Sequence, residues 1–112
     1  MTKDNSFAEY IRDLLEPFGT IKIKAMFGGY GIYCNDVFFA ILVENELYFK
    51  GDKGEVSDFF RANGSERFTY NAKGKNVAME YWKVLDEVLE DDESLSKWFN
   101  MSYNLALNKK KK

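Results

Sequence analysis

Two-residue turns divide the first half of the chain into short apolar segments, and this spacing constrains the fold more than any other feature. Asn35-Asp36 and Glu44-Asn45 each separate two segments with the composition of a β-strand. Gly28-Gly29 provides one further turn. Because connections this short join only antiparallel neighbours, the sequence predicts a meander. Its strands are expected over residues 21–27, 30–34, 37–43 and 46–50.

The remaining segments predict three helices and a hairpin. A helix is expected over residues 7–18, a second over 55–63, and a third from near Asp92, after an acidic linker over 86–92. The first helix should bury one stripe, formed by Phe7, Tyr10, Ile11, Leu14, Leu15 and Phe18. The last should bury Leu95, Trp98, Phe99, Ser102 and Ala106. Alternating apolar residues at 68–70 and 77–84, with a loop at 72–75, indicate the hairpin.

These elements define an α+β fold, with N-terminal, middle and C-terminal helices packed on an antiparallel sheet of about six strands. The sheet is a meander plus a hairpin. The 112 residues suffice for one core, so we expect a single domain over 1–112, with a flexible lysine-rich tail over 108–112. The segment 37–43 is apolar at every position, which predicts a central strand covered on both faces or lying beside an interface.

The composition removes most catalytic and metal chemistry. The chain has no histidine and a single cysteine, Cys34. It therefore lacks the usual general base and the commonest metal ligand, and a thiolate or imidazole zinc cluster cannot form. We predict no catalytic residues, no cofactor and no metal, and hence no enzyme. Cys34 on a strand is expected to be a small buried hydrophobic residue.

The glycines of Gly28-Gly-Tyr-Gly31 do not form a phosphate-binding loop. Such loops lead into a helix, and the mononucleotide type also requires Lys-Ser/Thr, whereas a strand follows here. We expect these positions to be glycine because the turn requires a positive φ and because neighbouring backbone or rings approach closely. If φ of Gly29 is positive, Gly29→Val should be strongly destabilising.

Two kinds of partner remain open. The chain carries 19 aromatic residues (ten Phe, seven Tyr, two Trp) but a net charge of -2. Nucleic acid could stack on tyrosines of the sheet beside lysines. The candidates are Tyr30, Tyr33, Tyr48, Tyr70, Lys22, Lys24 and Lys50. The negative net charge and this thin basic surface favour packing or protein contacts for these rings instead.

Several motifs together resemble the N-terminal domain of the TfoX/Sxy family. The first is Met26-Phe-Gly-Gly-Tyr-Gly-Ile-Tyr33, followed by Phe38-Phe-Ala-Ile-Leu42 and Glu46-Leu-Tyr-Phe-Lys50. Gly64-Ser-Glu-Arg-Phe68 and Met79-Glu-Tyr-Trp82 complete the set. The resemblance covers nearly the whole chain but only the first of the two domains of full-length members. These motifs are structural rather than catalytic.

The resemblance implies a regulator of natural competence, in a family thought to act with the cyclic-AMP receptor protein at bacterial promoters. We therefore predict a non-enzymatic transcription regulator that acts through protein contacts. The alternative is a nucleic-acid-binding module. As candidate interaction surface we take the residues around the glycine turn: Lys24, Met26, Phe27, Gly28, Gly29 and Tyr30.

Location and assembly complete the sequence-based predictions. The polar N-terminus and the lack of ~18 consecutive apolar residues predict neither signal peptide nor membrane span. The single cysteine suits a reducing cytoplasm. The apolar 37–43 segment and the aromatic excess predict a homodimer, because one small core does not readily hide so much apolar surface.

Overall fold

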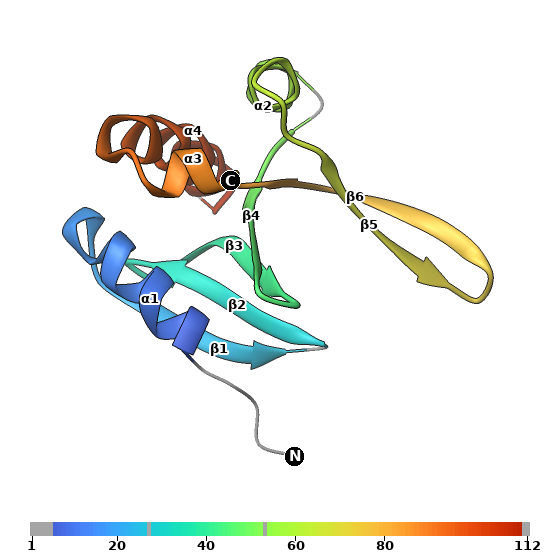
Figure 1. Ribbon diagram of the computed structural model, residues 1–112, viewed down its shortest axis with the longest axis horizontal. Coiled ribbons are helices and arrows are strands. Elements are labelled where there is room, and N and C mark those ends of the chain that lie inside the picture. The colour runs from blue at the N-terminus through green and yellow to red at the C-terminus, as the bar shows by residue number, and fades with distance from the viewer. Residues whose placement is uncertain (1–5, 27, 53, 111–112) are drawn as a thin grey trace.

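The computed structural model describes residues 6–26, 28–52 and 54–110. Across these residues six strands form one antiparallel sheet in the order β1-β2-β3-β4-β6-β5 (Figure 1). The strands are β1 (Ile21–Met26), β2 (Gly29–Cys34), β3 (Val37–Val43), β4 (Glu46–Lys50), β5 (Arg67–Ala72) and β6 (Lys75–Lys83). The first four strands are the predicted meander, and the predicted β5–β6 hairpin joins it through β6. The predicted α+β class is confirmed.

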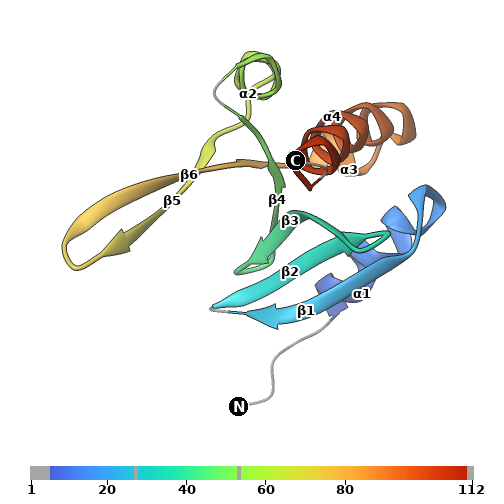
Figure 2. The ribbon, with the colours of Figure 1, turned by 180° about the vertical axis from the view of Figure 1, so that it is seen from behind.

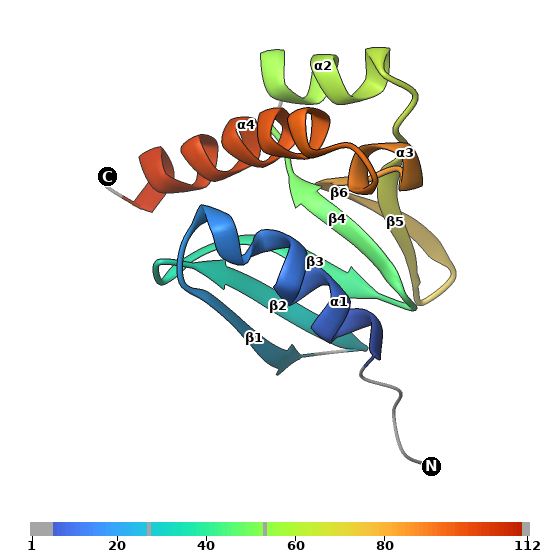
Figure 3. The same cartoon turned by 60° about the vertical axis from the view of Figure 1, so that its left-hand side comes forward.

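The helices cover one face of this sheet. They are α1 (Ser6–Leu15), the 3-10 turn η1 (Glu16–Phe18), α2 (Glu55–Ala62), α3 (Asp86–Leu89) and α4 (Asp92–Lys110). Figure 3 shows α1 and α4 over the same face, with α2 beyond α4. None of the described helices is long and apolar enough to cross a membrane.

Two features of the C-terminal part differ from expectation. The acidic stretch 86–92, predicted to be a linker, contains helix α3 because Val88 and Leu89 within it are buried in the core. Helix α4 continues to Lys110, so its backbone is helical well into the stretch 108–112 that we expected as a flexible tail. The mobility of that stretch stays a prediction.

The predicted two-residue turns have the backbone geometry that hairpins favour. Asn35 and Asp36 have φ of 50° and 69°, and Glu44 and Asn45 have φ of 53° and 63°. Positive φ at both central positions is the mark of a type I′ turn, whose twist matches that of the flanking strands. Lys73-Gly74, between β5 and β6, repeats this pattern with φ of 54° and 84°.

The condition of a positive φ at Gly29 is not met, although the turn does contain a glycine with positive φ. Among the described residues of this turn, Gly28 is left-handed, with φ of 68°, whereas Gly29 already belongs to β2 and pairs with Met26 and Val43. Gly29 is required for a different reason. A Cβ built on it would collide with the carbonyl oxygen of Leu42 on β3. Close approach of two strand backbones, rather than turn geometry, therefore selects glycine at position 29.

Strand β3 carries a bulge that sends two successive side chains into the core. Ile32 pairs with Ala40 but Tyr33 pairs with Phe38, so Phe39 is the extra residue. Phe39 and Ala40 are both completely buried. The bulge therefore interrupts the alternation of β3 and places Phe38 on the opposite face of the sheet from Phe39.

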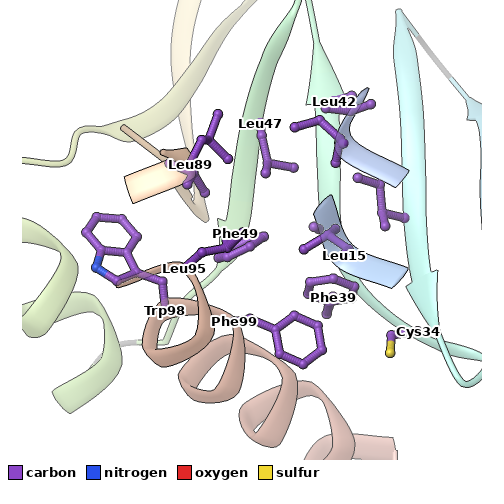
Figure 4. Packing of buried hydrophobic residues seen from close by; sticks show 14 of the residues in the cluster. Leu15, Cys34, Phe39, Leu42, Leu47, Phe49, Leu89, Leu95, Trp98 and Phe99 are labelled. Atoms are coloured by element: carbon purple, nitrogen blue, oxygen red, sulfur yellow. The ribbon is translucent and has the colours of Figure 1, made fainter. Parts of the chain in front are cut away.

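The Phe39 ring lies at the centre of the core between the sheet and α4 (Figure 4). Its centroid lies 5.5 Å from that of Phe49, 5.1 Å from that of Phe99 and 6.2 Å from that of Tyr103. The Ser102 hydroxyl donates a hydrogen bond of 3.2 Å to the Phe39 carbonyl. These contacts fix α4 on the bulged strand by both packing and a buried hydrogen bond.

The predicted helix stripes are largely confirmed. All five residues expected on the inner face of α4 are buried. On α1, Ile11 and Leu15 are buried as predicted, but Tyr10 is 43% exposed. Tyr10 lies at the border of the stripe, where it contacts the Phe7 ring at 6.0 Å, and Ala8 takes a buried place on the helix instead.

Candidate functional site

The sheet face opposite α1 and α4 bears an apolar groove of about 670 Å³. Figures 1 and 2 show the β5–β6 hairpin projecting from the rest of the sheet, at an angle to β1–β3. Residues from both parts line the hollow. We call them the open-face groove: Met26, Gly28, Tyr30, Phe38, Ile41, Val43, Glu44, Phe68, Tyr70, Met79 and Tyr81.

Residues on both sides of the bulge in β3 line part of this groove. Because Phe39 and Ala40 both enter the core, Phe38, Ile41 and Val43 are left on the helix-free face. One set of side chains of the uniformly apolar β3 thus packs in the core, and the other set lines the groove. This agrees with the predicted central position of β3, although no described helix covers its second face.

The groove has a buried floor and an exposed rim. Ile41 and Tyr81 are only 8% and 7% exposed, whereas Met26, Tyr70 and Met79 are 45%, 44% and 38% exposed. These three belong to the four large hydrophobic residues that are most exposed within the described chain. Clustered apolar exposure of this kind marks an interaction surface more often than scattered single residues do.

Aromatic rings and lysines extend the face beyond one end of the groove. The Phe38 ring lies 5.1 Å from Tyr33 and 6.3 Å from Tyr81. The Lys24 ammonium lies 5.1 Å from the Tyr33 ring, and that of Lys50 lies 5.5 Å from the Tyr81 ring. Burial, followed by the neighbouring Tyr33 hydroxyl, raises the pKa of Tyr81. This end therefore presents lysine ammonium groups over aromatic rings.

The opposite end of the groove is acidic. Phe38 stands near the start of β3, and Glu44 follows its last residue, Val43. The Glu44 side chain lines the hollow there and is exposed. Lysines lie near the Phe38 end of the groove and a carboxylate lies at its Val43 end. The two ends of the apolar groove therefore carry opposite charges.

The structure brings part of the predicted surface into this groove. Met26, Gly28 and Tyr30 line it, and Lys24 lies beside it over Tyr33. Gly29 is buried backbone and offers no side chain. Tyr30 also packs against the core and borders a smaller hollow of about 210 Å³ beneath α1. Phe27 lies outside the described residues.

Sequence reasoning missed the other half of the groove. The missed residues are Phe38, Ile41, Val43, Glu44, Phe68, Met79 and Tyr81, whereas Tyr70 was predicted only as a ring on which nucleic acid could stack. Their alternation in β5 and β6 was visible in the sequence, but it did not say where the hairpin would lie. The bulge in β3 changes which of its side chains face the groove. The sequence does not indicate this change, because the residues on both sides of the bulge are apolar.

Cys34 does not contribute a reactive site. Its side chain is completely buried, and burial raises the pKa of the thiol. The sulfur lies 3.9 Å from the Phe18 carbonyl, to which it donates a weak hydrogen bond. Within the described part of the chain, no three His, Cys, Asp or Glu side chains form a group that could hold a metal ion.

We expect the Cys34 thiol to react slowly in the folded protein. At pH 8, alkylation should be roughly a hundredfold slower than in denaturant, the factor imposed by a local opening free energy of about 3 kcal/mol. Since the folded-state pKa is raised, the thiol favours folding below its unfolded pKa of about 8.5, and this contribution is lost as the pH rises through the folded pKa. Alkylation followed by mass spectrometry measures the rate, and equal rates in both states would contradict the burial.

The fold and the groove place the chain among small α+β domains with an uncovered apolar sheet face. Sequence comparison then shows the family. The profile of the TfoX N-terminal domain matches residues 13–106, and the chain belongs to this family.

Two curated relatives support the assignment. The chain is similar to the DNA transformation protein TfoX1 of Aliivibrio fischeri, with 30% identity over 74 residues, which are 66% of the chain and 35% of that protein. It is also similar to Protein Sxy of Escherichia coli, with 24% identity over 99 residues, which are 88% of the chain and 47% of that protein. The chain thus spans less than half the length of either relative.

Proposed function

We propose that this chain is a regulator of DNA-uptake competence that acts in the cytoplasm by binding a protein of the transcription machinery. It works as a binding module rather than an enzyme, and the open-face groove is its contact surface. The observation that carries the proposal is the groove itself, since three of its rim side chains expose large apolar area on one face. Membership in the TfoX family and the name of one relative, a DNA transformation protein, support the competence role.

The charges around the groove support a particular kind of partner segment. An extended apolar segment would cover Ile41 and Tyr81 on the floor. An acidic residue at one of its ends would approach Lys24 and Lys50, and a basic residue at the other would approach Glu44. Complementary charges of this kind set orientation and specificity more than affinity. The cyclic-AMP receptor protein is the first partner to test, on the strength of the family resemblance.

Gene replacement in the native cell tests the competence role. Deleting the gene should lower the transcripts of DNA-uptake genes under inducing conditions, and supplying the intact chain should restore them. An unchanged transcript profile after deletion would overturn the proposal. The transcript level in cells supplied with the intact chain is the reference with which variants of the groove are compared.

One observation favours a second function, the binding of single-stranded nucleic acid. Lys24 and Lys50 lie against tyrosine rings on an open sheet face, an arrangement on which bases stack and phosphates bind. Two other cations of this face are engaged in ion pairs, Lys22 with Asp36 at 3.1 Å and Lys83 with Glu46 at 3.5 Å. The net charge of -2 also opposes a phosphate chain.

A salt titration decides between the two functions. Nucleic-acid binding should be strongest at ~50 mM salt and should weaken steeply as salt rises. Under the nucleic-acid hypothesis, Lys24→Ala with Lys50→Ala lowers the affinity and the salt slope together. Under the protein-partner proposal, neither DNA nor RNA binds even at ~50 mM salt.

A further inference from the structure

The two edges of the sheet differ in how they are protected. Edge strand β1 carries Lys22 and Lys24, and the Arg12 guanidinium of α1 donates a hydrogen bond of 3.4 Å to the Ile21 carbonyl. Edge strand β5 has the sequence Arg-Phe-Thr-Tyr-Asn-Ala, with neither lysine nor proline, and among the described strands it pairs only with β6. Lysine and proline are common devices against edge-to-edge pairing. At its start β5 has the charged Arg67 and an irregular register with β6 between Arg67 and Thr69, but its stretch from Thr69 to Ala72 carries no charge and pairs regularly. That stretch is the less protected of the two edges.

We propose that β5 pairs antiparallel with β5 of a second copy of this chain, so that the two sheets become one. The hairpin that carries this edge projects from the body of the molecule (Figures 1 and 2). Thr69, Tyr70 and Asn71 are all exposed there. The proposal does not depend on the partner of the groove.

The register of the hairpin shows which backbone groups are available for such pairing. Lys73-Gly74 is a two-residue turn, so the flanking pair Ala72 and Lys75 is a hydrogen-bonded one. Hydrogen-bonded and non-hydrogen-bonded pairs alternate along an antiparallel ladder. The pair formed by Tyr70 is therefore hydrogen-bonded too, and the backbone groups of Tyr70 point toward β6. Thr69 and Asn71 then direct their backbone N–H and C=O groups to the open edge.

One register makes this edge complementary to itself. A two-fold axis through Thr69 pairs Thr69 with its own copy. Each residue before Thr69 then lies opposite the residue of the second copy that is equally far after Thr69. Phe68 then lies opposite Tyr70 of the second copy, which gives two aromatic cross-strand pairs on the groove face. The charged Arg67 lies opposite the neutral Asn71.

The neighbouring registers are less favourable. A shift by one position turns the second sheet over, so that Phe68 no longer shares a face with Tyr70 of the other copy. An axis through Tyr70 sets Arg67 opposite Lys73, and like charges directly opposite are destabilising. Of these registers, the axis through Thr69 combines an available backbone ladder with two aromatic pairs and no charge conflict. The two open-face grooves then lie on the same side of one continuous sheet.

Light scattering coupled to gel filtration tests the assembly. The intact chain should have twice the 13.1 kDa chain mass at about 100 µM, whereas Thr69→Lys should have the monomer mass, because an edge lysine opposes pairing. Ala78→Lys is the matched control. Ala78 is exposed and pairs with Thr69 across the hairpin. Ala78→Lys therefore adds the same charge to the same face of the hairpin without changing the β5 edge. The dimer should persist in this variant.

A cross-link tests the register. In a Cys34→Ser background, Thr69→Cys should form an interchain disulfide under mild oxidation, because the two copies of position 69 face each other within disulfide reach. Ala78→Cys in the same background should not. A monomeric intact chain, a dimeric Thr69→Lys variant, a monomeric Ala78→Lys variant, or equal cross-linking at both positions would overturn the proposal. Circular dichroism of each variant verifies that a change of mass is not a loss of folding.

Discussion

Gly29→Ala is expected to lower the free energy of unfolding by about 3 kcal/mol or more, although it adds a single methyl group. The added Cβ would collide with the carbonyl oxygen of Leu42, and atoms of Leu42 and Val43 close the space around it. These are backbone atoms of β3, so relief requires the β2–β3 ladder to move. For a domain whose total stability is on the order of 5–15 kcal/mol, this loss is large.

Gly28→Ala is the matched control for this substitution. Gly28 has a positive φ of 68°, but no heavy atom lies within 4 Å of an added Cβ. Its replacement should cost only about 1–2 kcal/mol, from the left-handed backbone alone. Urea unfolding of both variants separates crowding from backbone conformation. Equal midpoints for the two variants would show that the close approach at Gly29 is wrong.

Phe39→Ala is expected to cost about 3–5 kcal/mol, the range for removing a large aromatic side chain from a packed core. The ring is completely buried and contacts rings from β4 and α4. Its loss leaves a cavity at the point where α4 is fixed on the sheet. Denaturant unfolding followed by tryptophan fluorescence reports the effect, because Trp98 of α4 belongs to the same core.

The neighbouring phenylalanine gives the control for Phe39. Phe38 is half-buried and faces the groove, outside the core cluster. Phe38→Ala should therefore destabilise the fold clearly less than Phe39→Ala. If the two substitutions had equal effects, or if Phe38→Ala were the more damaging, the bulge and the assignment of faces along β3 would be wrong.

The sequence predicted the elements that depend on local signals. Asn35-Asp36 and Glu44-Asn45 lie between apolar segments, so the meander follows from turn chemistry and strand length. The inner stripe of α4 follows from its period, and Leu95 and Trp98 are buried as expected. The bulge at Phe39 was not predictable, because a run of apolar residues looks the same with or without a displaced alternation.

The candidate site was predictable only in its first half. Met26 and Tyr30 belong to a glycine-rich turn that stands out in the sequence, and both line the groove. The other wall comes from β5 and β6, and its position depends on pairing between Phe49 of β4 and Trp82 of β6. That pairing joins segments separated by a helix, and no local signal specifies it.

The central claim, that the open-face groove is the working surface, is tested most directly by Met26→Glu and Tyr10→Glu in the competence assay. Both residues are exposed large hydrophobics, at 45% and 43%, but Met26 lies on the groove rim and Tyr10 lies on α1. Both variants should fold. Met26→Glu should lower the transcripts of DNA-uptake genes about tenfold or more, because burying an unpaired carboxylate in an apolar contact costs at least ~1.4 kcal/mol. Tyr10→Glu should leave them at the level of the intact chain, and full activity of Met26→Glu or equal loss in both variants would contradict the claim.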